Sequence, residues 1–243
     1  MEQKTYNGFC LIYVNGMAIR NTLDDDFGII HRRSTDVNNF APKFYIPENE
    51  IWLDQPYRDE TDSLLKIEFF ATDYNLDPAI SYQAERQLMR ETLCFAGPVP
   101  DLVKKSETVA GLKIVYVDGK LVRQYLDPEF ILGGHDLVYD YIPTGEIWLD
   151  AKLNPAEFPY LLEHERVERR LMAEGKSHDS AHDFAIAADK ELRRQNGVGR
   201  ECPETHRRNI EDAGRIRPRT IWPADGNAKI VIVEYSDTEC PFC

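Results

Sequence analysis

The sequence predicts an α+β fold in which a strand-rich unit occurs twice and the second copy ends in an antiparallel helix hairpin. Of 243 residues, 42% are hydrophobic and 29% charged, which is typical of a globular chain of one or two domains. Segment 45–54 returns as 141–150, with Tyr-Ile-Pro and Glu-Ile-Trp-Leu-Asp at the same places. Capped helical patterns follow the second copy of this block.

The repeat extends on both sides of this block. Upstream, the string Tyr13-Val14-Asn15-Gly16 matches Tyr116-Val117-Asp118-Gly119, and downstream 85–89 matches 168–172. The order is preserved, and the extra residues of the first copy are typical of loop insertions. We therefore expect copy one at 1–100, copy two at 101–196, a linker at 197–226 and a separate segment at 227–243.

Strands and turns are expected to open each copy. The dipeptides Asn15-Gly16 and Asp118-Gly119 lie between apolar residues and predict two-residue hairpins, because both can adopt positive φ. A second hairpin is expected at each Tyr-Ile-Pro block, since proline ends one strand before Ile-Trp-Leu begins the next. Residues 64–72 predict a further strand in copy one.

Helices are expected to close each copy, at 78–91 and at 155–174. The second of these has Asn154 as N-cap, Pro155 at its first position and Gly175 as its stop. A further helix at 178–194, capped by Ser177, would pack back on it as a helix hairpin. Its apolar stripe consists of Ala181, Phe184, Ala185, Ala188 and Leu192.

Charge and composition exclude several classes of partner. The 29 basic and 42 acidic residues give a net charge of −13, which repels phosphate backbones, so we expect no nucleic acid. No apolar run reaches the roughly 18 residues of a membrane span, and residues 1–4 lead into no apolar export segment. Five cysteines are too few for a disulfide-stapled fold, which fits a reducing compartment. We therefore expect a cytoplasmic protein, and the lack of an apolar span predicts no membrane partner.

The first candidate site is residues 164–168, His-Glu-Arg-Val-Glu, on the expected helix 155–174. Residues four apart share a helix face, so His164 and Glu168 can hold one metal ion, with Glu165 beside it as general base. His182 lies seven residues after Gly175, as Glu168 lies seven before it. In an antiparallel hairpin these heights coincide, which predicts a site of His164, Glu168 and His182 for a divalent transition metal, zinc above all.

Other polar residues extend this prediction. His178 is a reserve ligand, and Asp189 could be a carboxylate behind the ligands. His135, after two glycines, could be a further ligand from a loop, although a loop histidine is more often merely exposed. His31 is the approximate counterpart of His135 in copy one. Because Ser81-Tyr82 takes the place of the histidine and the candidate base there, we expect metal binding in copy two alone.

Two other interpretations of this helix remain open. Glu165 and Glu168 could form a buried structural network, with Glu168 as the partner of an arginine. They could instead lie on an ordinary solvated face. Against the solvated face, Glu165 falls near the centre of the apolar stripe, where a carboxylate needs a partner. That stripe consists of Phe158, Leu161, Leu162 and Met172.

Residues 164–168 resemble the His-Glu-x-x-His motif of zinc hydrolases, with Glu168 in place of the second histidine. The resemblance implies metal-assisted hydrolysis, in which the ion polarises a carbonyl and lowers the pKa of its water while Glu165 acts as base. Copy two also resembles prokaryotic and phage proteins to which we attach no activity. The alternative function is a non-catalytic module that binds an unknown protein or peptide.

The second candidate site lies at 227–243, where an apolar strand runs into Cys240-Pro241-Phe242-Cys243. This segment resembles the opening of a DsbA-type thiol-disulfide oxidoreductase of thioredoxin fold. The resemblance implies Cys240 as attacking thiolate and Cys243 as resolving thiol. We expect this to be the beginning of a longer redox domain, inactive without the remainder. Alternatives are a chance strand with two thiols, or a zinc set completed by Cys202 and His206.

Overall fold

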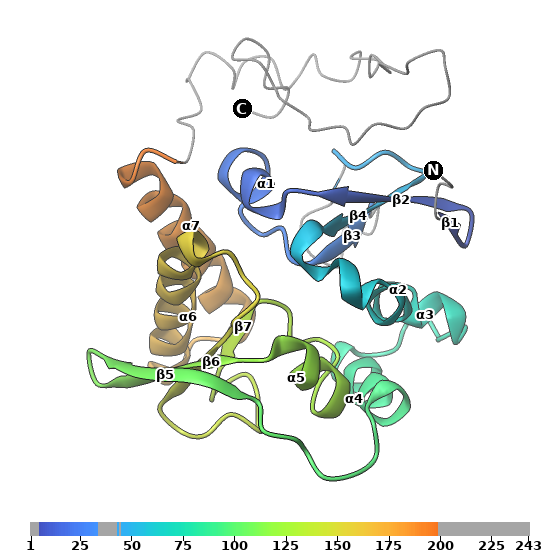
Figure 1. Cartoon of the computed structure of the whole chain (residues 1–243). Helices are drawn as coiled ribbons and strands as arrows, with labels where there is room; N and C mark the ends of the chain where they lie inside the picture. The colour runs from blue at the N-terminus through green and yellow to red at the C-terminus, as the bar shows by residue number, and fades with distance from the viewer. Residues whose placement is uncertain (1–4, 34–42, 44, 199–243) are drawn as a thin grey trace.

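A computed structural model describes residues 5–33, 43 and 45–198 (Figure 1). This part of the chain is α+β, with two four-stranded mixed sheets and seven α-helices. The predictions made for segment 227–243, among them the thioredoxin-like strand, Cys240 and Cys243, lie outside the described residues. The same holds for Cys202, His206 and the expected linker beyond residue 198.

The first sheet has the strand order β1-β2-β4-β3. Its strands are β1 (Thr5–Tyr6), β2 (Phe9–Val14), β3 (Ile30–Arg32) and β4 (Glu50–Asp54). β4 pairs with β2 in parallel and with β3 antiparallel. The parallel pair requires a crossover, which helix α1 (Gly16–Thr22) begins.

The second sheet repeats this arrangement as β5-β6-β8-β7. Its strands are β5 (Val103–Val109), β6 (Leu112–Val117), β7 (Gly133–His135) and β8 (Glu146–Asp150), and helix α5 (Gly119–Tyr125) follows β6. β8 again pairs with β6 in parallel and with β7 antiparallel. The equal topology agrees with the predicted repetition and makes positions comparable by register. Arg32 lies opposite Ile51 as His135 lies opposite Ile147.

The hairpins predicted at Asn15-Gly16 and Asp118-Gly119 are wrong. Both dipeptides begin helices, since the Asn15 side chain accepts the Ala18 amide proton and Asp118 accepts that of Leu121. Each unit does open with a two-residue hairpin, but one strand earlier. Its turns are Asn7-Gly8, with φ of 47° and 83°, and Ala110-Gly111, with φ of 50° and 82°.

Two further elements also differ from expectation. The Tyr-Ile-Pro blocks are turns that lead into β4 and β8, and each of these pairs antiparallel with the preceding strand, β3 or β7. An antiparallel pair therefore spans each block, but no strand ends at the proline as expected, because β3 ends at Arg32 and β7 at His135. Residues 64–72 form no strand. They lie in the helices α2 (Thr61–Glu68) and α3 (Phe70–Asp73), which follow the 3-10 helix η1 (Gln55–Glu60). The helix expected at 78–91 is α4 (Tyr82–Leu93), capped by Ser81.

The predicted helix hairpin is present. The 3-10 turn η2 (Pro155–Glu157), capped by Asn154, leads into α6 (Phe158–Ala173), and Gly175 follows with φ of 94°. Helix α7 (His178–Gln195), capped by Ser177, lies beside α6 in Figure 1. Its buried face is shifted from the expected stripe. It consists of Ala181, Ala185, Asp189 and Arg193, whereas Phe184 is exposed.

The copy-one counterpart of α6 is α2 rather than α4. α2 begins at Thr61 directly after buried Glu60, as α6 begins at Phe158 directly after buried Glu157. Each helix then carries Leu-Leu at its fourth and fifth positions and a glutamate at its eighth. Glu68 is therefore equivalent to Glu165, and the alignment of 85–89 with 168–172 does not describe equivalent places in the fold.

Each unit places one buried glutamate against an arginine of the other unit, and we call Glu60 and Glu157 the exchanged glutamates. Arg20 of the first unit bonds to its own Asp54 at 3.2 Å and to Glu157 of the second unit. The opposite set is Arg123, which bonds to its own Asp150 at 3.1 Å and to Glu60 of the first unit at 2.8 Å. These six side chains are nearly inaccessible, so the units are joined through ion pairs with little solvent screening.

Candidate metal centre

The face of helix α6 that packs on the second sheet has an apolar part followed by a part with buried carboxyl groups. Phe158, Leu161 and Leu162 pack on the core residues of β6 and β8. One turn further, Glu165 and Glu168 are 6% and 4% exposed. This burial contradicts the solvated-face interpretation, and it places two carboxyl groups where each needs a partner.

Three of the predicted ligands converge between α6 and α7. His182 Nδ1 lies 3.2 Å from His164 Nε2 and 3.1 Å from Glu168 Oε1. His164, Glu168 and His182 each offer a ligand atom within 4.8 Å of the others. The convergence follows from the hairpin, because the turn at Gly175 brings the start of α7 back along the end of α6. The structure therefore brings together the set that the spacing predicted.

The ring of His182 is held between two carboxylates. Its Nε2 lies 3.5 Å from Asp26 Oδ1, and its Nδ1 faces Glu168. Burial acts to lower the pKa of His182, but the bonds to Asp26 and Glu168 outweigh it and raise the pKa to about 10. Asp26 belongs to copy one, so the centre is completed across the two units. Sequence reasoning missed Asp26, and the acidic run 24–26 was its only signal.

Glu168 is contacted by three histidines. His135 Nε2 lies 3.1 Å from its Oε2, and His178 Nε2 lies 3.3 Å from its Oε1, beside His182. Burial acts to raise the pKa of Glu168, but the hydrogen bonds from His135 and His182 outweigh it and hold the pKa well below its usual range. His135 is buried rather than exposed, and both His135 and His178 lie beside Glu168. The contacts of Glu168 are with imidazoles rather than with the arginine of the structural interpretation.

Burial shifts the pKa values of His164 and Glu165 in opposite directions, and in both cases the shift favours the neutral form. Burial lowers the pKa of His164 to about 4, and neighbouring His182 adds to this, so its ring has a free nitrogen lone pair for a metal ion. Burial raises the pKa of Glu165 well above its ordinary value, and the charge of Glu168 raises it further. Glu165 Oε2 is buried and has no hydrogen-bond partner in the described part of the chain.

Two other expected site residues lie elsewhere. Asp189 bonds to Arg193 at 2.8 Å and belongs to the interface with Glu157, so it does not support the ligands. His31 lies on β3, where its Nε2 accepts the Gly28 amide proton at 2.9 Å. By register its equivalent is Gly134, whereas the equivalent of His135 is Arg32.

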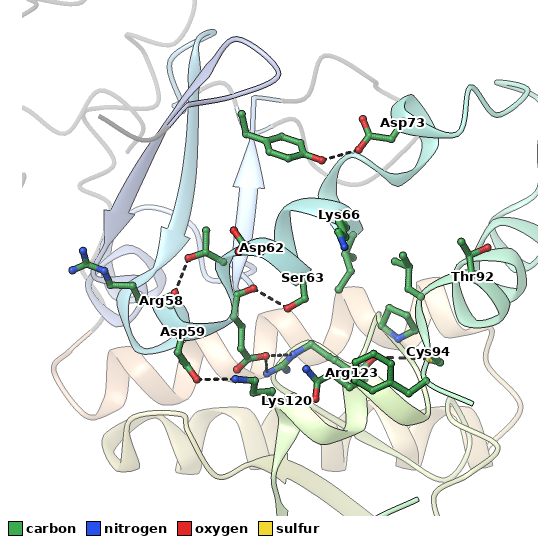
Figure 2. Close-up of a pocket in the computed structure, with 18 of the residues that line it drawn as sticks. Arg58, Asp59, Asp62, Ser63, Lys66, Asp73, Thr92, Cys94, Lys120 and Arg123 are labelled. Carbon is green, nitrogen blue, oxygen red and sulfur yellow. Dashed lines mark hydrogen bonds and ion pairs between the residues drawn. The ribbon is translucent and has the colours of Figure 1, made fainter. Parts of the chain in front are cut away.

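One cavity in the described part of the chain is separate from these histidines. It has a volume of about 960 Å³ and is lined by residues of both units, but by none of the candidate ligands. Figure 2 shows Arg58, Lys66 and Lys120 among acidic side chains, with Cys94 at one side. Lys120 pairs with Asp59 at 3.2 Å, so the charges of the cavity wall are partly neutralised within it.

Comparisons with known proteins add no relative. Neither family models, curated proteins nor solved structures gave a match to this chain. Among the described residues, none of the helices combines the length and the apolar character needed to cross a membrane.

Proposed function

We propose that the second copy binds a divalent transition-metal ion, zinc above all, through His164, Glu168 and His182, and that this centre catalyses metal-assisted hydrolysis. The supporting observation is the approach of His182 Nδ1 to both other ligand atoms, at 3.2 Å and 3.1 Å. Donors bound tetrahedrally at zinc distances are separated by about 3.3 Å, so an ion fits with small side-chain shifts.

The surroundings of the ligands support a metal centre. Asp26 accepts from His182 Nε2, which leaves Nδ1 directed toward Glu168. His135 bonds to Oε2 of Glu168, which leaves Oε1 directed toward His182. Carboxylate and imidazole contacts of this kind fix the orientation of metal ligands and tune their affinity.

A catalytic role is favoured over a purely structural one by ligand number and exposure. Catalytic zinc sites have three protein ligands and keep a further position for water or substrate. The side of the centre formed by His178 and His182 is partly open, with side-chain exposures of 39% and 21%. A bound ion would polarise a carbonyl or phosphoryl oxygen and lower the pKa of a water molecule. Glu165 has one oxygen without a hydrogen-bond partner in the described residues. The charge of a bound ion would favour its ionised form, which would then accept the proton of that water.

The test is metal content and its dependence on the ligands. The metal-depleted full chain should take up zinc, and its stability should rise by about 2.7 kcal/mol at a free zinc concentration of 100 times Kd. A His164→Ala/His182→Ala variant should lose this uptake, whereas His31→Gln, which removes a histidine outside the centre, should retain it. No uptake, or equal uptake by the double variant, would contradict the proposal.

Catalysis needs a separate assay. Ester, peptide and phosphoester substrates should be hydrolysed only by the zinc-loaded chain, and Glu165→Gln should abolish turnover while the ion at His164 and His182 is retained. Hydrolysis that is unchanged in Glu165→Gln would contradict the base role.

A second candidate function is the non-catalytic binding module. It is favoured by the 960 Å³ cavity between the units, which could accept an extended peptide segment (Figure 2). The two functions differ in metal content, since a module of this kind needs no ion at His164, Glu168 and His182.

A further inference from the structure

A second group of metal-ligating atoms lies on the other side of Glu168. It consists of His135 on β7 with Glu165 and Glu168 on α6, whose ligand atoms lie within 4.8 Å of one another. His135 is fully buried, and both glutamates are at least nine-tenths buried. Glu168 has His178 and His182 on its other side, whereas Glu165 Oε2 has no hydrogen-bond partner in the described residues. A buried carboxylate in that position is costly unless a cation or a proton balances its charge.

Glu165 contributes a carboxyl oxygen to this group, within 4.8 Å of the ligand atoms of His135 and Glu168. Its Oε2 is buried without a hydrogen-bond partner in the described residues. The carboxyl group has room there because residue 133 is glycine. A Cβ at Gly133 would lie 3.2 Å from Glu165 Oε1 and 3.0 Å from the Trp148 carbonyl oxygen. The backbone of β7 is thus open where the carboxyl group approaches it.

Copy one shows how the same position is neutralised by a cation. Arg32 occupies the register position of His135, and Glu68 the helix position of Glu165. There the guanidinium Nε lies 3.2 Å from Glu68 Oε1, so this partly buried carboxylate, 18% exposed, has a positive partner within the chain. In copy two the arginine is replaced by a shorter imidazole, and the described residues place no guanidinium at Glu165 Oε2. A cation of another kind would restore the balance.

Glu168 is placed to serve both groups of ligands at once. Its Oε2 lies 3.1 Å from His135 Nε2, and its Oε1 lies 3.1 Å from His182 Nδ1. The two oxygens therefore face different sets of donors. In two-metal hydrolytic centres the ions lie about 3.5–4 Å apart, a separation that one carboxylate can bridge.

We infer that a second divalent transition-metal ion binds to His135, Glu165 and Glu168, so that the centre holds two ions with the Glu168 carboxylate between them. The inference rests on the proposed function, because the first ion is the one bound by His164, Glu168 and His182. A glutamate that binds through one oxygen keeps the other as a proton acceptor, so a second ion is compatible with the base role of Glu165.

Binding of this ion has a cost at His135. The Leu137 amide donates to His135 Nδ1 at 3.2 Å, so the ring proton is on Nε2, which donates to Glu168. To bind an ion through Nε2, the ring must move its proton to Nδ1 and give up the Leu137 contact. The hydrogen bond from the Leu137 amide is long, at 3.2 Å, so little free energy is lost with it. The attraction of the ion to the Glu165 and Glu168 carboxylates would offset that loss.

The experiment counts ions in the full chain. Cys240→Ser and Cys243→Ser are included in every sample so that thiolates add no ion, and no histidine tag is present. Metal-depleted protein is titrated with Co²⁺ and Mn²⁺, with elemental analysis after gel filtration and with electron paramagnetic resonance of the Mn²⁺ form. We expect about two ions per chain and a spin-coupled Mn²⁺ pair, as a shared carboxylate requires.

Two variants assign the second ion. Glu165→Gln, which is nearly isosteric, and His135→Arg, which introduces the residue that copy one has at this position, should each bind about one ion and show an uncoupled Mn²⁺ signal. One ion in the unsubstituted chain would overturn the second ion and leave the proposed function intact. No ion would refute both. Two ions in Glu165→Gln would also overturn the inference, and this variant decides if His135→Arg does not fold.

Discussion

Removal of Glu157 should test how strongly the exchanged glutamates hold the two units together. Its carboxylate accepts from Arg20 of the first unit and from Arg193 of α7, at 2.8 Å for the Arg193 Nη1. All three side chains are at most 4% exposed. In Glu157→Ala, both guanidinium groups would remain buried with one carboxylate fewer, and water would have little access to replace it.

The expected magnitude follows from what remains. Removing one partner of a buried ion pair costs about 3–5 kcal/mol. Arg20 keeps Asp54 at 3.2 Å, and Arg193 keeps Asp189 at 2.8 Å, so neither cation is left without a counter-charge. The loss should therefore lie near the lower limit, at about 3 kcal/mol of unfolding free energy.

The assay is equilibrium unfolding in urea, followed by fluorescence of the buried Trp52 and Trp148. The matched control is Glu174→Ala, which removes a glutamate from an exposed pair with Arg170 and should leave the midpoint close to that of the unsubstituted chain. A loss below about 1 kcal/mol for Glu157→Ala would refute the reasoning and show that the interface tolerates the missing carboxylate.

Three further predictions concern single residues. Burial lowers the pKa of His31 to about 4, so the unfolded chain binds a proton that the folded chain does not, and this residue should lower the unfolding free energy by up to about 2.6 kcal/mol from pH 6.5 to 4. Urea titrations of His31→Gln should show a flatter pH profile. Gly119→Ala would place a Cβ 1.9 Å from Asp150 Oδ2 and should cost about 2 kcal/mol or more in the same assay. Asp26→Asn should weaken zinc binding about 10–100-fold in calorimetry, whereas Asp25→Asn on the same loop should not.

The helix hairpin and the meeting of His164, Glu168 and His182 could be predicted because their signals are local. Caps and stops fix where α6 and α7 begin and end, and the spacing from Gly175 then fixes which residues meet. The contribution of Asp26 could not be predicted in this way. It comes from the other unit and depends on how α7 packs against the segment after α1, which no local pattern encodes.

The hairpin predicted at Asn15-Gly16 is wrong for a definite physical reason. The same dipeptide suits a hairpin turn or a helix N-cap followed by a small residue. The choice is made by Asp54, which is distant in sequence. Its Oδ1 accepts the Gly16 amide proton at 2.9 Å, and a Cβ at residue 16 would lie 2.2 Å from its Oδ2. The glycine is needed for close approach to this carboxylate rather than for positive φ, and Gly119 meets Asp150 in the same way.

The difference between the two copies comes down to how far one helix continues. Both place a glutamate at the eighth position of the helix after the exchanged glutamate, as Glu68 and Glu165. α2 ends there, and the chain turns into the short α3, so no donor on a continuous helix follows one turn later. α6 has 16 residues and carries Glu168 on the turn after Glu165, beside His164. Only a helix of that length can offer a carboxylate both to a strand residue and to the returning α7. Copy one neutralises its glutamate with Arg32, whereas copy two has the donors that a metal ion requires.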